Sequence, residues 1–441
     1  MPGAMLTGGH LGALRQDPLP TISSRETSRT MQSAVCPAMT DESTVAGIAR
    51  SGMPGGCSLP GFLTLDPLPV ETSRVLFDLT RLMRLSHRSF GTGVDRIDLA
   101  IGLGLVRRFG RSCLFVHAGP SGPILLRHET GAAFLDGLWA RWHSAAGQPE
   151  SVMRQISRFT ASHARGLFGK PSGMPGDDIT YVNASHAGLP QRRGALAAID
   201  PDKRMRRLAY IHDLMPIEYP EYQKPAAVDR FRVFLDELTS TPVRLLANSA
   251  DTARRVTCHA TAMGWSVEAA TPLIPRLVPH DYATPPVRPA VQQVLDAQSP
   301  FFVIIGTIEP RKNHLLLLHL WREMARSSTP PRLVVIGRRG WENEMVVDLL
   351  ERSAALKPHV VEFGDLTDAE THTLLGGARA LLMPSFTEGL GLPLLEAGAM
   401  GVRAIVSDLP ALREIGAPGT LYLDPLDGPA WRAAITALAE A

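Results

Sequence analysis

Two glutamates near the end of the chain are spaced so that one short segment could hold a ligand from both sides. Glu388 and Glu396 lie eight positions apart in the segment 385–396, which reads SFTEGLGLPLLE. Glu388 follows the apolar run Ala380–Met383, which predicts a strand, and Glu396 falls on the helix expected next. Carboxylates at these places could accept hydrogen bonds from the hydroxyl groups of a polyol. Two glutamates at this spacing also occur by chance, so the residues between them decide the interpretation.

The residues between the two glutamates suit an anion. Gly389 and Gly391 allow backbone N–H groups to come close to a ligand. Pro393 fits the first turn of a helix, and a helix N-terminus attracts negative charge such as a phosphate. A phosphate flanked by hydroxyl-binding carboxylates describes a nucleotide sugar, and we predict that this segment binds one.

A second string points to the same ligand. Residues 306–313 read GTIEPRKN and follow another apolar run. Arg311 and Lys312 stand where a diphosphate would need neutralising, because Arg can bind phosphate oxygens with two N–H groups and Lys acts as a mobile point charge. The alternative is a solvated basic loop in which Asn313 caps the next helix.

Both strings fall at the ends of predicted strands in a regularly alternating region. Apolar runs that predict strands alternate with helical segments over Phe301–Ile305, Leu333–Ile336, Val360–Phe363, Ala380–Met383, Ala404–Ser407 and Thr420–Leu423. This pattern is typical of a parallel sheet with helices on both faces. In such sheets ligands bind beyond the carboxyl ends of the strands.

The middle of the chain repeats the pattern less regularly. Strands are predicted over Val75–Phe77, Cys113–His117, Ile124–Leu126, Ile179–Val182, Leu208–Ile211 and Val243–Ala247, and the proline-rich stretch Pro272–Pro289 predicts a linker. We therefore predict an α/β fold with two doubly wound domains facing a cleft, over 71–290 and 291–441. Residues 1–70 are rich in Gly, Pro, Ser and Thr without apolar periodicity, and we expect them to be disordered.

The first of these domains carries its own candidates. His212 directly follows the predicted strand Leu208–Ile211, so it should point into the cleft, where a neutral imidazole offers one donor and one acceptor. The alternative is a structural histidine that hydrogen-bonds to groups of the loop. For the neighbouring Asp213 we expect such a structural role. His186 also follows a strand and could border an acceptor.

A glycine-containing loop follows the first predicted strand. Gly93 is the residue expected to approach a ligand closely, although Arg96 replaces the last glycine of the dinucleotide-binding fingerprint. The basic residues before it, which are Arg81, Arg84, His87 and Arg88, could meet an anionic acceptor or form a solvated loop.

Composition limits the other possibilities. A net charge of +2 gives no reason to expect nucleic acid as a partner. The four cysteines are scattered without metal-ligand spacing, so they indicate no metal site, and a reduced cytoplasmic setting fits best. We expect no cofactor, because a nucleotide-sugar donor is a substrate. No apolar run approaches ~18 residues and no secretory signal is recognisable. Ser151–Lys170 mixes basic and apolar residues, which is typical of a solvated helix face or of a segment touching an anionic membrane surface.

These motifs together resemble the large retaining glycosyltransferase family called group 1 or family 4. The resemblance is close over about 300–425, weaker over 74–300, and absent over 1–70. It implies the GT-B fold of two Rossmann-like domains and a nucleotide-sugar donor held without metal. By the same resemblance Glu396 would bind the ribose, Glu388 the transferred sugar, and Arg311 with Lys312 the diphosphate.

The family also implies roles for the remaining candidates. Backbone groups of Gly389, Leu390, Gly391 and Leu392 would lie near the sugar and phosphates, with Gly306 and Gly93 beside the donor. His212 would lie close to the donor sugar.

The wider pattern resembles bacterial exopolysaccharide and lipopolysaccharide mannosyltransferases. It therefore predicts hexose transfer, with mannose from GDP-mannose as the first candidate, onto a saccharide or polyprenyl-diphosphate-linked acceptor, with possible peripheral contact at the inner face of a membrane. Two alternatives stay open at this point. One is a nucleotide-sugar-binding protein without turnover, and the other is a glycoside hydrolase that uses Glu388 and Glu396 as its carboxylate pair.

Overall fold

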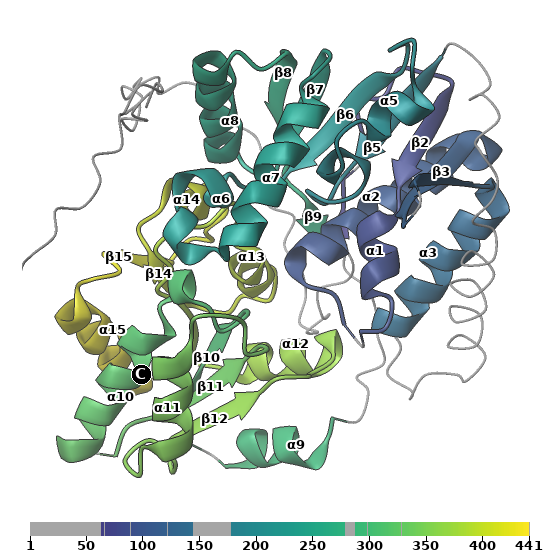
Figure 1. Cartoon of the computed structure of the whole chain (residues 1–441). Coiled ribbons are helices and arrows are strands. Elements are labelled where there is room, and N and C mark those ends of the chain that lie inside the picture. Colours follow the sequence, from purple (N-terminus) through teal and green to yellow (C-terminus); the bar gives the residue numbers. More distant parts are fainter. Residues whose placement is uncertain are drawn as a thin grey trace, which may run out of the picture. The chain divides into compact units, whose positions relative to one another are not determined.

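The computed structural model describes residues 63–65, 67–88, 90–120, 122–143, 178–277, 287–297, 299–327 and 329–440. The basic segment Ser151–Lys170 lies outside these ranges, as do residues 1–62 of the stretch expected to be disordered. Two sheets dominate the described chain, one before residue 273 and one after residue 300 (Figure 1).

The first sheet has seven strands in the order β4-β3-β2-β5-β6-β7-β8. Its strands are β2 (Arg74–Asp78), β3 (Cys113–Gly119), β4 (Gly122–Leu126), β5 (Ile179–Asn183), β6 (Arg206–Ile211), β7 (Val243–Ala247) and β8 (Val267–Pro272). All neighbours are parallel except β3 and β4, which form an antiparallel pair. The six predicted strands are all present, and β8 is an addition at the edge.

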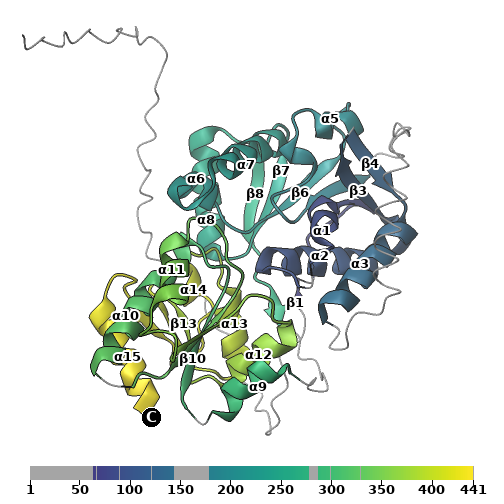
Figure 2. The same cartoon turned by 60° about the horizontal axis from the view of Figure 1, so that its bottom comes forward.

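Helices cover both faces of this sheet because successive side chains of each strand point to opposite faces. Val75 and Phe77 pack with α2 (Gly93–Phe109) and α3 (His128–His143), whereas Leu76 packs with α5 (Ala195–Ile199). Figure 2 shows α2 and α3 on one side of the strands and α5 with α7 (Pro225–Leu238) on the other. Helix α8 (Ala250–Met263) begins at its N-cap Ser249, directly after β7.

The second sheet has six parallel strands in the order β12-β11-β10-β13-β14-β15. They are β10 (Phe301–Ile305), β11 (Arg332–Ile336), β12 (Val360–Phe363), β13 (Ala380–Met383), β14 (Ala404–Ser407) and β15 (Leu421–Leu423). Each prediction for this region is matched within one residue. Only apolar side chains suit strands that are buried on both faces, which is why the runs were recognisable.

Alternate residues of this sheet also serve two cores. Val303 packs with α9 (Pro289–Asp296), α12 (Asp368–Gly377) and α13 (Leu392–Ala399), while Phe302 packs with α10 (His314–Ser327) and α15 (Gly428–Glu440). Figure 2 shows these two groups of helices on opposite sides of β10 and β13. The remaining elements are short connections: β1 (Leu63–Thr64) pairing with β9 (Arg276–Leu277), α1 (Thr80–Leu85), α6 (Met215–Glu218), α11 (Glu344–Arg352), α14 (Pro410–Arg413) and the 3-10 turns Gly110–Ser112, Leu189–Gln191, Pro220–Tyr222 and Pro310–Lys312.

The predicted division of the chain into domains 71–290 and 291–441 is consistent with the positions of the two sheets. The exact boundaries of these domains stay a prediction. At the end of the first stretch, Leu63, Leu65, Leu68 and Val70 are buried in the core beside α2.

Candidate functional site

The Glu388 loop joins β13 to α13 and places its carboxylate inside the molecule. Gly391 is the N-cap residue of α13 and has a φ of +95°, a left-handed conformation that favours glycine. Pro393 follows in the first turn, as predicted. Glu388 and Glu396 are only 6% and 2% exposed, so both carboxylates depend on protein partners for their stability.

Glu388 is held by three side chains. Its Oε1 accepts from Lys312 Nζ at 2.5 Å and from Ser385 Oγ at 2.7 Å, and its Oε2 accepts from Arg311 Nη1 at 3.0 Å. Burial raises the pKa of Glu388, but the Lys312 and Arg311 cations outweigh burial and lower it to about 2. The carboxylate therefore stays ionised at neutral pH, with room for about one further hydrogen bond among its lone pairs.

Arg311 and Lys312 lie in the short turn before α10. Asn313 closes this turn with a φ of +54°, and the N–H of Phe386 donates to the carbonyl of Arg311 at 2.8 Å, which ties the two loops together. Arg311 also contacts Glu309 Oε1 at 2.6 Å. Burial lowers the pKa of Lys312 although Glu388 opposes it. Burial also acts to lower the pKa of Arg311, but Glu388 and Glu309 together outweigh burial and raise it. The two cations thus face two carboxylates, and Glu309 is a member that the sequence did not identify.

Glu396 is held by side chains from both domains. Arg96 of α2 donates to its Oε1 at 2.5 Å and contacts Asp368 at 3.6 Å, and His372 Nε2 lies 3.5 Å from the same Oε1. Burial raises the pKa of Glu396, but chiefly Arg96 lowers it to about 2. Since these groups contact Oε1, Oε2 can accept from a ligand hydroxyl. Arg96 and His372 were missed as partners, although the arginine in place of the third glycine was a visible signal.

His212 follows β6, as expected, and is 3% exposed. Its Nε2 lies 2.6 Å from the carbonyl oxygen of Ala184, so Nε2 carries the proton and Nδ1 the lone pair. Its backbone N–H donates to His186 Nε2 at 2.9 Å. Burial, and next the neighbouring His186, lower the pKa of His212 to about 3, so the ring is neutral. His186 supports this strand end from behind and does not line the cavity described below.

Close backbone approach explains several glycines. A Cβ at Gly389 would overlap the carbonyl oxygen of His212, and the Ser249 hydroxyl donates to the Gly389 carbonyl at 2.7 Å. A Cβ at Gly93 would lie 2.9 Å from Leu392 Cδ1. Gly306 has a φ of +146°, and a Cβ there would lie 3.3 Å from Lys312 Cε. Each predicted glycine therefore lies where two elements meet.

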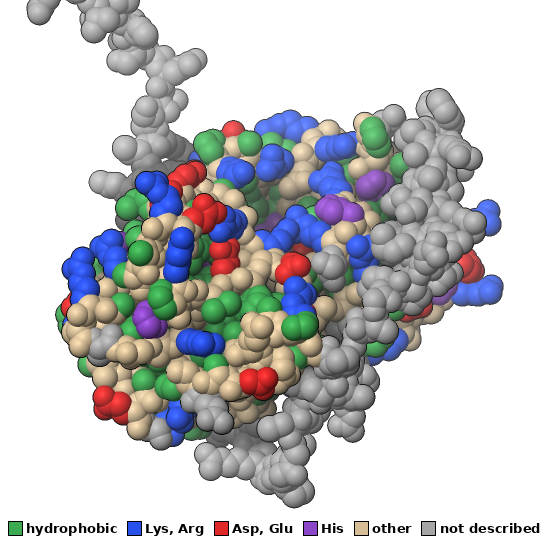
Figure 3. Space-filling view, turned by 90° about the horizontal axis from the view of Figure 1, so that it is seen from below, with side chains coloured by type: hydrophobic (Ala, Val, Ile, Leu, Met, Phe, Trp, Pro, Cys, Tyr) green, Lys and Arg blue, Asp and Glu red, His purple; other side chains and the backbone are tan. Residues whose placement is uncertain are grey.

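The residues predicted to bind the donor or to act in catalysis all border one cavity of about 630 Å³ between the strand ends of the two sheets. Figure 3 shows the surface from below, where Lys and Arg side chains border a hollow. The cavity is lined by the predicted residues Gly93, His212, Gly306, Arg311, Lys312, Glu388, Gly389, Leu390, Gly391, Leu392 and Glu396. Leu390 and Leu392 also pack into the core beneath α2. Of the basic loop before Gly93, Arg81 and Arg88 reach the cavity, while Arg84 and His87 are not among its lining residues.

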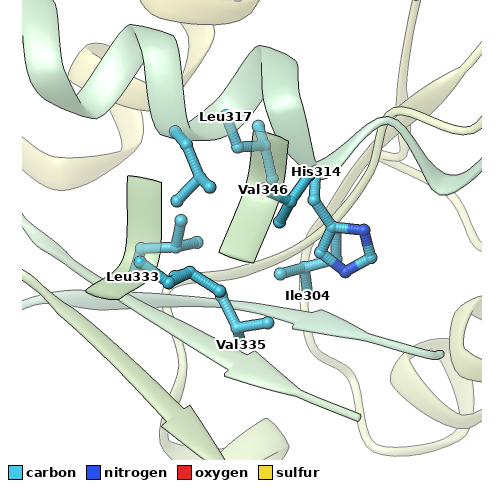
Figure 4. A pocket seen from close by; sticks show the side chains of 8 residues that line it. Ile304, His314, Leu317, Leu333, Val335 and Val346 are labelled. Carbon is cyan, nitrogen blue, oxygen red and sulfur yellow. The ribbon is translucent and has the colours of Figure 1, made fainter. Parts of the chain in front are cut away.

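A second, closed space lies behind the Lys312 turn. His314 begins α10 and points among Ile304, Leu317, Val335 and other apolar side chains (Figure 4). The space is too small for a water molecule, and both ring nitrogens of His314 are buried without a hydrogen-bond partner among the described residues. Burial lowers the pKa of His314 to about 3, with a smaller contribution from Lys312.

Comparison with known proteins finds a family similarity for the second sheet's domain. Residues 290–439 match the family described as Glycosyl transferases group 1. This stretch of the chain is therefore similar to that family. The matched stretch thus contains Gly306, Arg311, Lys312 and the whole Glu388 loop, as the resemblance predicted.

Curated relatives extend the similarity into the first domain. The chain is 25% identical over 296 residues to the serotype-specific mannosyltransferase WbdA of Escherichia coli, covering 62% of this chain and 35% of that protein. It is 34% identical over 142 residues to the O-antigen chain mannosyltransferase B of Escherichia coli, covering 32% of this chain and 36% of that protein. The chain thus spans about a third of the length of these relatives.

Solved structures show the fold. The Anabaena protein HepE, in complex with UDP and glucose, aligns over 84% of this chain and 90% of its own with a TM-score of 0.54 and 15% identity. Sucrose-phosphate synthase of Thermosynechococcus elongatus aligns over 83% and 90% with a TM-score of 0.51 and 16% identity. The predicted GT-B fold class is confirmed. In the ranges that the structure describes, no helix has the length and apolar character needed to cross a membrane.

Proposed function

We propose that the chain is a retaining glycosyltransferase that moves a hexose from a nucleotide sugar to a hydroxyl group of a saccharide or lipid-linked saccharide. The observation that carries this proposal is the ionised Glu388 held by Lys312 and Arg311 in the cavity. A carboxylate that binds sugar hydroxyls beside two cations that bind a diphosphate is the arrangement a nucleotide-sugar donor requires.

The groups divide the donor among them. Oε2 of Glu396 accepts from the ribose hydroxyls, and backbone N–H groups at the start of α13 face the phosphates. Lys312 and Arg311 stabilise the negative charge that grows on the leaving diphosphate, which is electrostatic stabilisation of the transition state. This division needs no metal ion, and none is part of the proposal.

The chemical step breaks the bond between C1 of the sugar and the phosphate oxygen. A new bond forms between C1 and the acceptor oxygen on the same face, and the acceptor proton passes to the leaving phosphate. Neutral His212 lies beside the sugar, with Nδ1 available as an acceptor, and its backbone carbonyl lies against the Glu388 loop. His212 therefore positions the sugar in this proposal.

The charge state of the two glutamates argues against glycoside hydrolysis. A hydrolase pair needs one carboxylic acid that is protonated near its working pH. The Lys312, Arg311 and Arg96 cations instead hold the pKa of both Glu388 and Glu396 near 2, although burial acts in the opposite direction. Neither is a proton donor at neutral pH.

Mannose from GDP-mannose is the first donor to test, because the named relatives are mannosyltransferases. The proposal keeps the acceptor that the sequence resemblance predicted, which is a saccharide or a saccharide linked to a polyprenyl diphosphate. The test measures release of nucleoside diphosphate from GDP-mannose, UDP-glucose and related donors by wild type, Glu388→Gln and Lys312→Ala. Release that requires both side chains supports transfer. Nucleotide binding without any release would leave only a binding protein, and absence of nucleotide binding would overturn the donor site.

A further inference from the structure

The cavity contains more basic side chains than the two, Arg311 and Lys312, that the proposed donor diphosphate uses. Seven basic side chains line it: Arg81, Arg88, Arg96, Arg311, Lys312, Arg338 and Arg339. Five of these contact a carboxylate. The pairs are Arg81 with Asp95, Arg96 with Glu396, Arg311 with Glu309 and Glu388, Lys312 with Glu388, and Arg339 with Glu351 and Glu362.

Arg88 and Arg338 are the exceptions. Within the described residues neither forms an ion pair with a carboxylate. Asp95 is the acid whose charge reaches Arg88, but its carboxylate is already held by Arg81 at 2.6 Å. The Arg338 guanidinium instead lies 5.6 Å from the ring centre of Phe90, which is a cation–π contact.

The two guanidinium groups come from different sheets and share one space. Arg88 follows α1, and its backbone carbonyl accepts from Trp142 Nε1 at 3.3 Å, which fixes this part of the loop. Arg338 follows β11 in the second domain. Burial, and next the positive charge of Arg338, lower the pKa of Arg88. Two like charges in one cavity repel each other, and an anion between them would remove this cost.

We propose that Arg88 and Arg338 form a second anion site in this cavity, which binds a phosphate or diphosphate group of the acceptor. The assignment of this anion to the acceptor rests on the proposed function, but the anion site itself does not. Each guanidinium presents a planar fork of N–H donors that matches two oxygens of a phosphate. A diphosphate has enough oxygens to engage both.

The donor is the less suitable source for this anion. The donor diphosphate is matched by Lys312 and Arg311. These two side chains lie in the turn before α10 and donate hydrogen bonds to Glu388. Arg88 belongs to the first domain, on the side from which an acceptor would approach the sugar. An acceptor with a diphosphate near its reacting end would contact Arg88 and Arg338 while the donor diphosphate stays at Lys312.

Isothermal titration of the full chain with inorganic pyrophosphate tests the site. It is done on the free chain and on the chain saturated with the nucleoside diphosphate that binds it best. The variants are Arg88→Gln and Arg338→Gln, and Arg339→Gln is the matched control because it removes one charge from the same loop while that arginine is already held by Glu351 and Glu362. Thermal unfolding checks that each variant folds.

Wild type should bind pyrophosphate when nucleotide is already bound. Arg88→Gln and Arg338→Gln should each weaken this binding at least about tenfold, with nucleotide affinity and the control unchanged. Geranyl diphosphate should compete for the same site, since the acceptor carries an esterified diphosphate. If geranyl diphosphate does not displace pyrophosphate, the site does not accept an esterified diphosphate, and the acceptor assignment is overturned.

Two results would overturn the site itself. One is equal pyrophosphate affinity in wild type and both variants while nucleotide binds normally. The other is a loss of nucleotide affinity as large as the loss of pyrophosphate affinity, which would assign the arginines to the donor. If no nucleotide binds at all but both variants lose pyrophosphate, the donor site fails and the anion site stands.

Discussion

Gly389 lies directly against the backbone carbonyl of His212, so the Glu388 loop of the second domain touches the strand end of the other sheet. Asn248 Nδ2 donates to the same His212 carbonyl at 2.6 Å, and Ser249 Oγ donates to the Gly389 carbonyl at 2.7 Å. Further along, Glu414 accepts from the backbone N–H groups of Ala250 and Asp251 at 2.7 Å, at the start of α8. The position of the Glu388 loop therefore depends on the first domain.

Gly389→Ala should disable the proposed sugar transfer, because a Cβ would overlap the His212 carbonyl and displace the loop that carries Glu388. We expect kcat/KM to fall by about 100-fold or more, since small misplacements of reacting groups have effects of this size. The measurement is initial rate of nucleoside diphosphate release. Gly428→Ala is the control, because its Cβ would meet Leu316 at an ordinary 3.6 Å. Equal rates for the two variants would contradict the contact.

Arg96→Ala should weaken nucleotide binding and stability together. It removes the main partner of Glu396, which is 2% exposed, and loss of one partner of a buried ion pair costs roughly 3–5 kcal/mol. Arg96→Ala combined with Glu396→Gln should recover part of the stability but not the nucleotide affinity. Urea unfolding and titration calorimetry measure the two quantities. Unchanged stability in Arg96→Ala would show that the pair is not formed in solution.

The sequence predicted the sheets well because buried parallel strands are short apolar runs, and all of those runs formed strands. β8 was missed because this edge strand, VEAATP, is largely exposed and has no apolar run. The donor-side motifs were recognisable because they are local strings. Arg96 was not recognised as a partner of Glu396, because the two residues lie 300 positions apart and on different domains. Glu309 and His372 were not recognised because sequence alone does not show which way their side chains point.

The pH dependence of catalysis should be flat between about pH 5 and 8. Glu388 and Glu396 have pKa values lowered to about 2, chiefly by Lys312 and Arg96 against the effect of burial, and burial lowers that of His212 to about 3. None of these groups therefore changes charge in this range. The check is kcat/KM measured across it with the preferred donor. An inflection near pH 6.5 that disappears in His212→Asn would show that His212 titrates in the free enzyme.

Activity should withstand removal of divalent metals. In the proposed mechanism Arg311 and Lys312 supply the positive charge that the leaving diphosphate needs. EDTA should then change the rate by less than about twofold, while Lys312→Ala should lower kcat by about 100-fold or more. Rates with EDTA, and with EDTA followed by excess Mg²⁺, measure this. Loss of activity that Mg²⁺ restores would assign the charge neutralisation to a metal ion.

His314→Leu should stabilise the protein, and more so in acid. The buried ring has two nitrogens without partners, and replacing it by an apolar side chain of similar size should raise the free energy of unfolding by about 1–2 kcal/mol at pH 7.5. Burial lowers the folded-state pKa from 6.5 to about 3, so below pH 6.5 the unfolded chain binds a proton that the folded chain does not. Wild type therefore loses stability as the pH falls from 6.5 towards 3, and the advantage of the variant should grow by about 2 kcal/mol at pH 5.

Two other buried histidines keep the variant acid-sensitive in part, because burial also lowers the pKa values of His186 and His212 to about 3. Urea unfolding at both pH values measures the difference, with the exposed His319→Leu on the same helix as control. A gap that does not widen at pH 5 would mean that His314 finds a proton acceptor or water in solution.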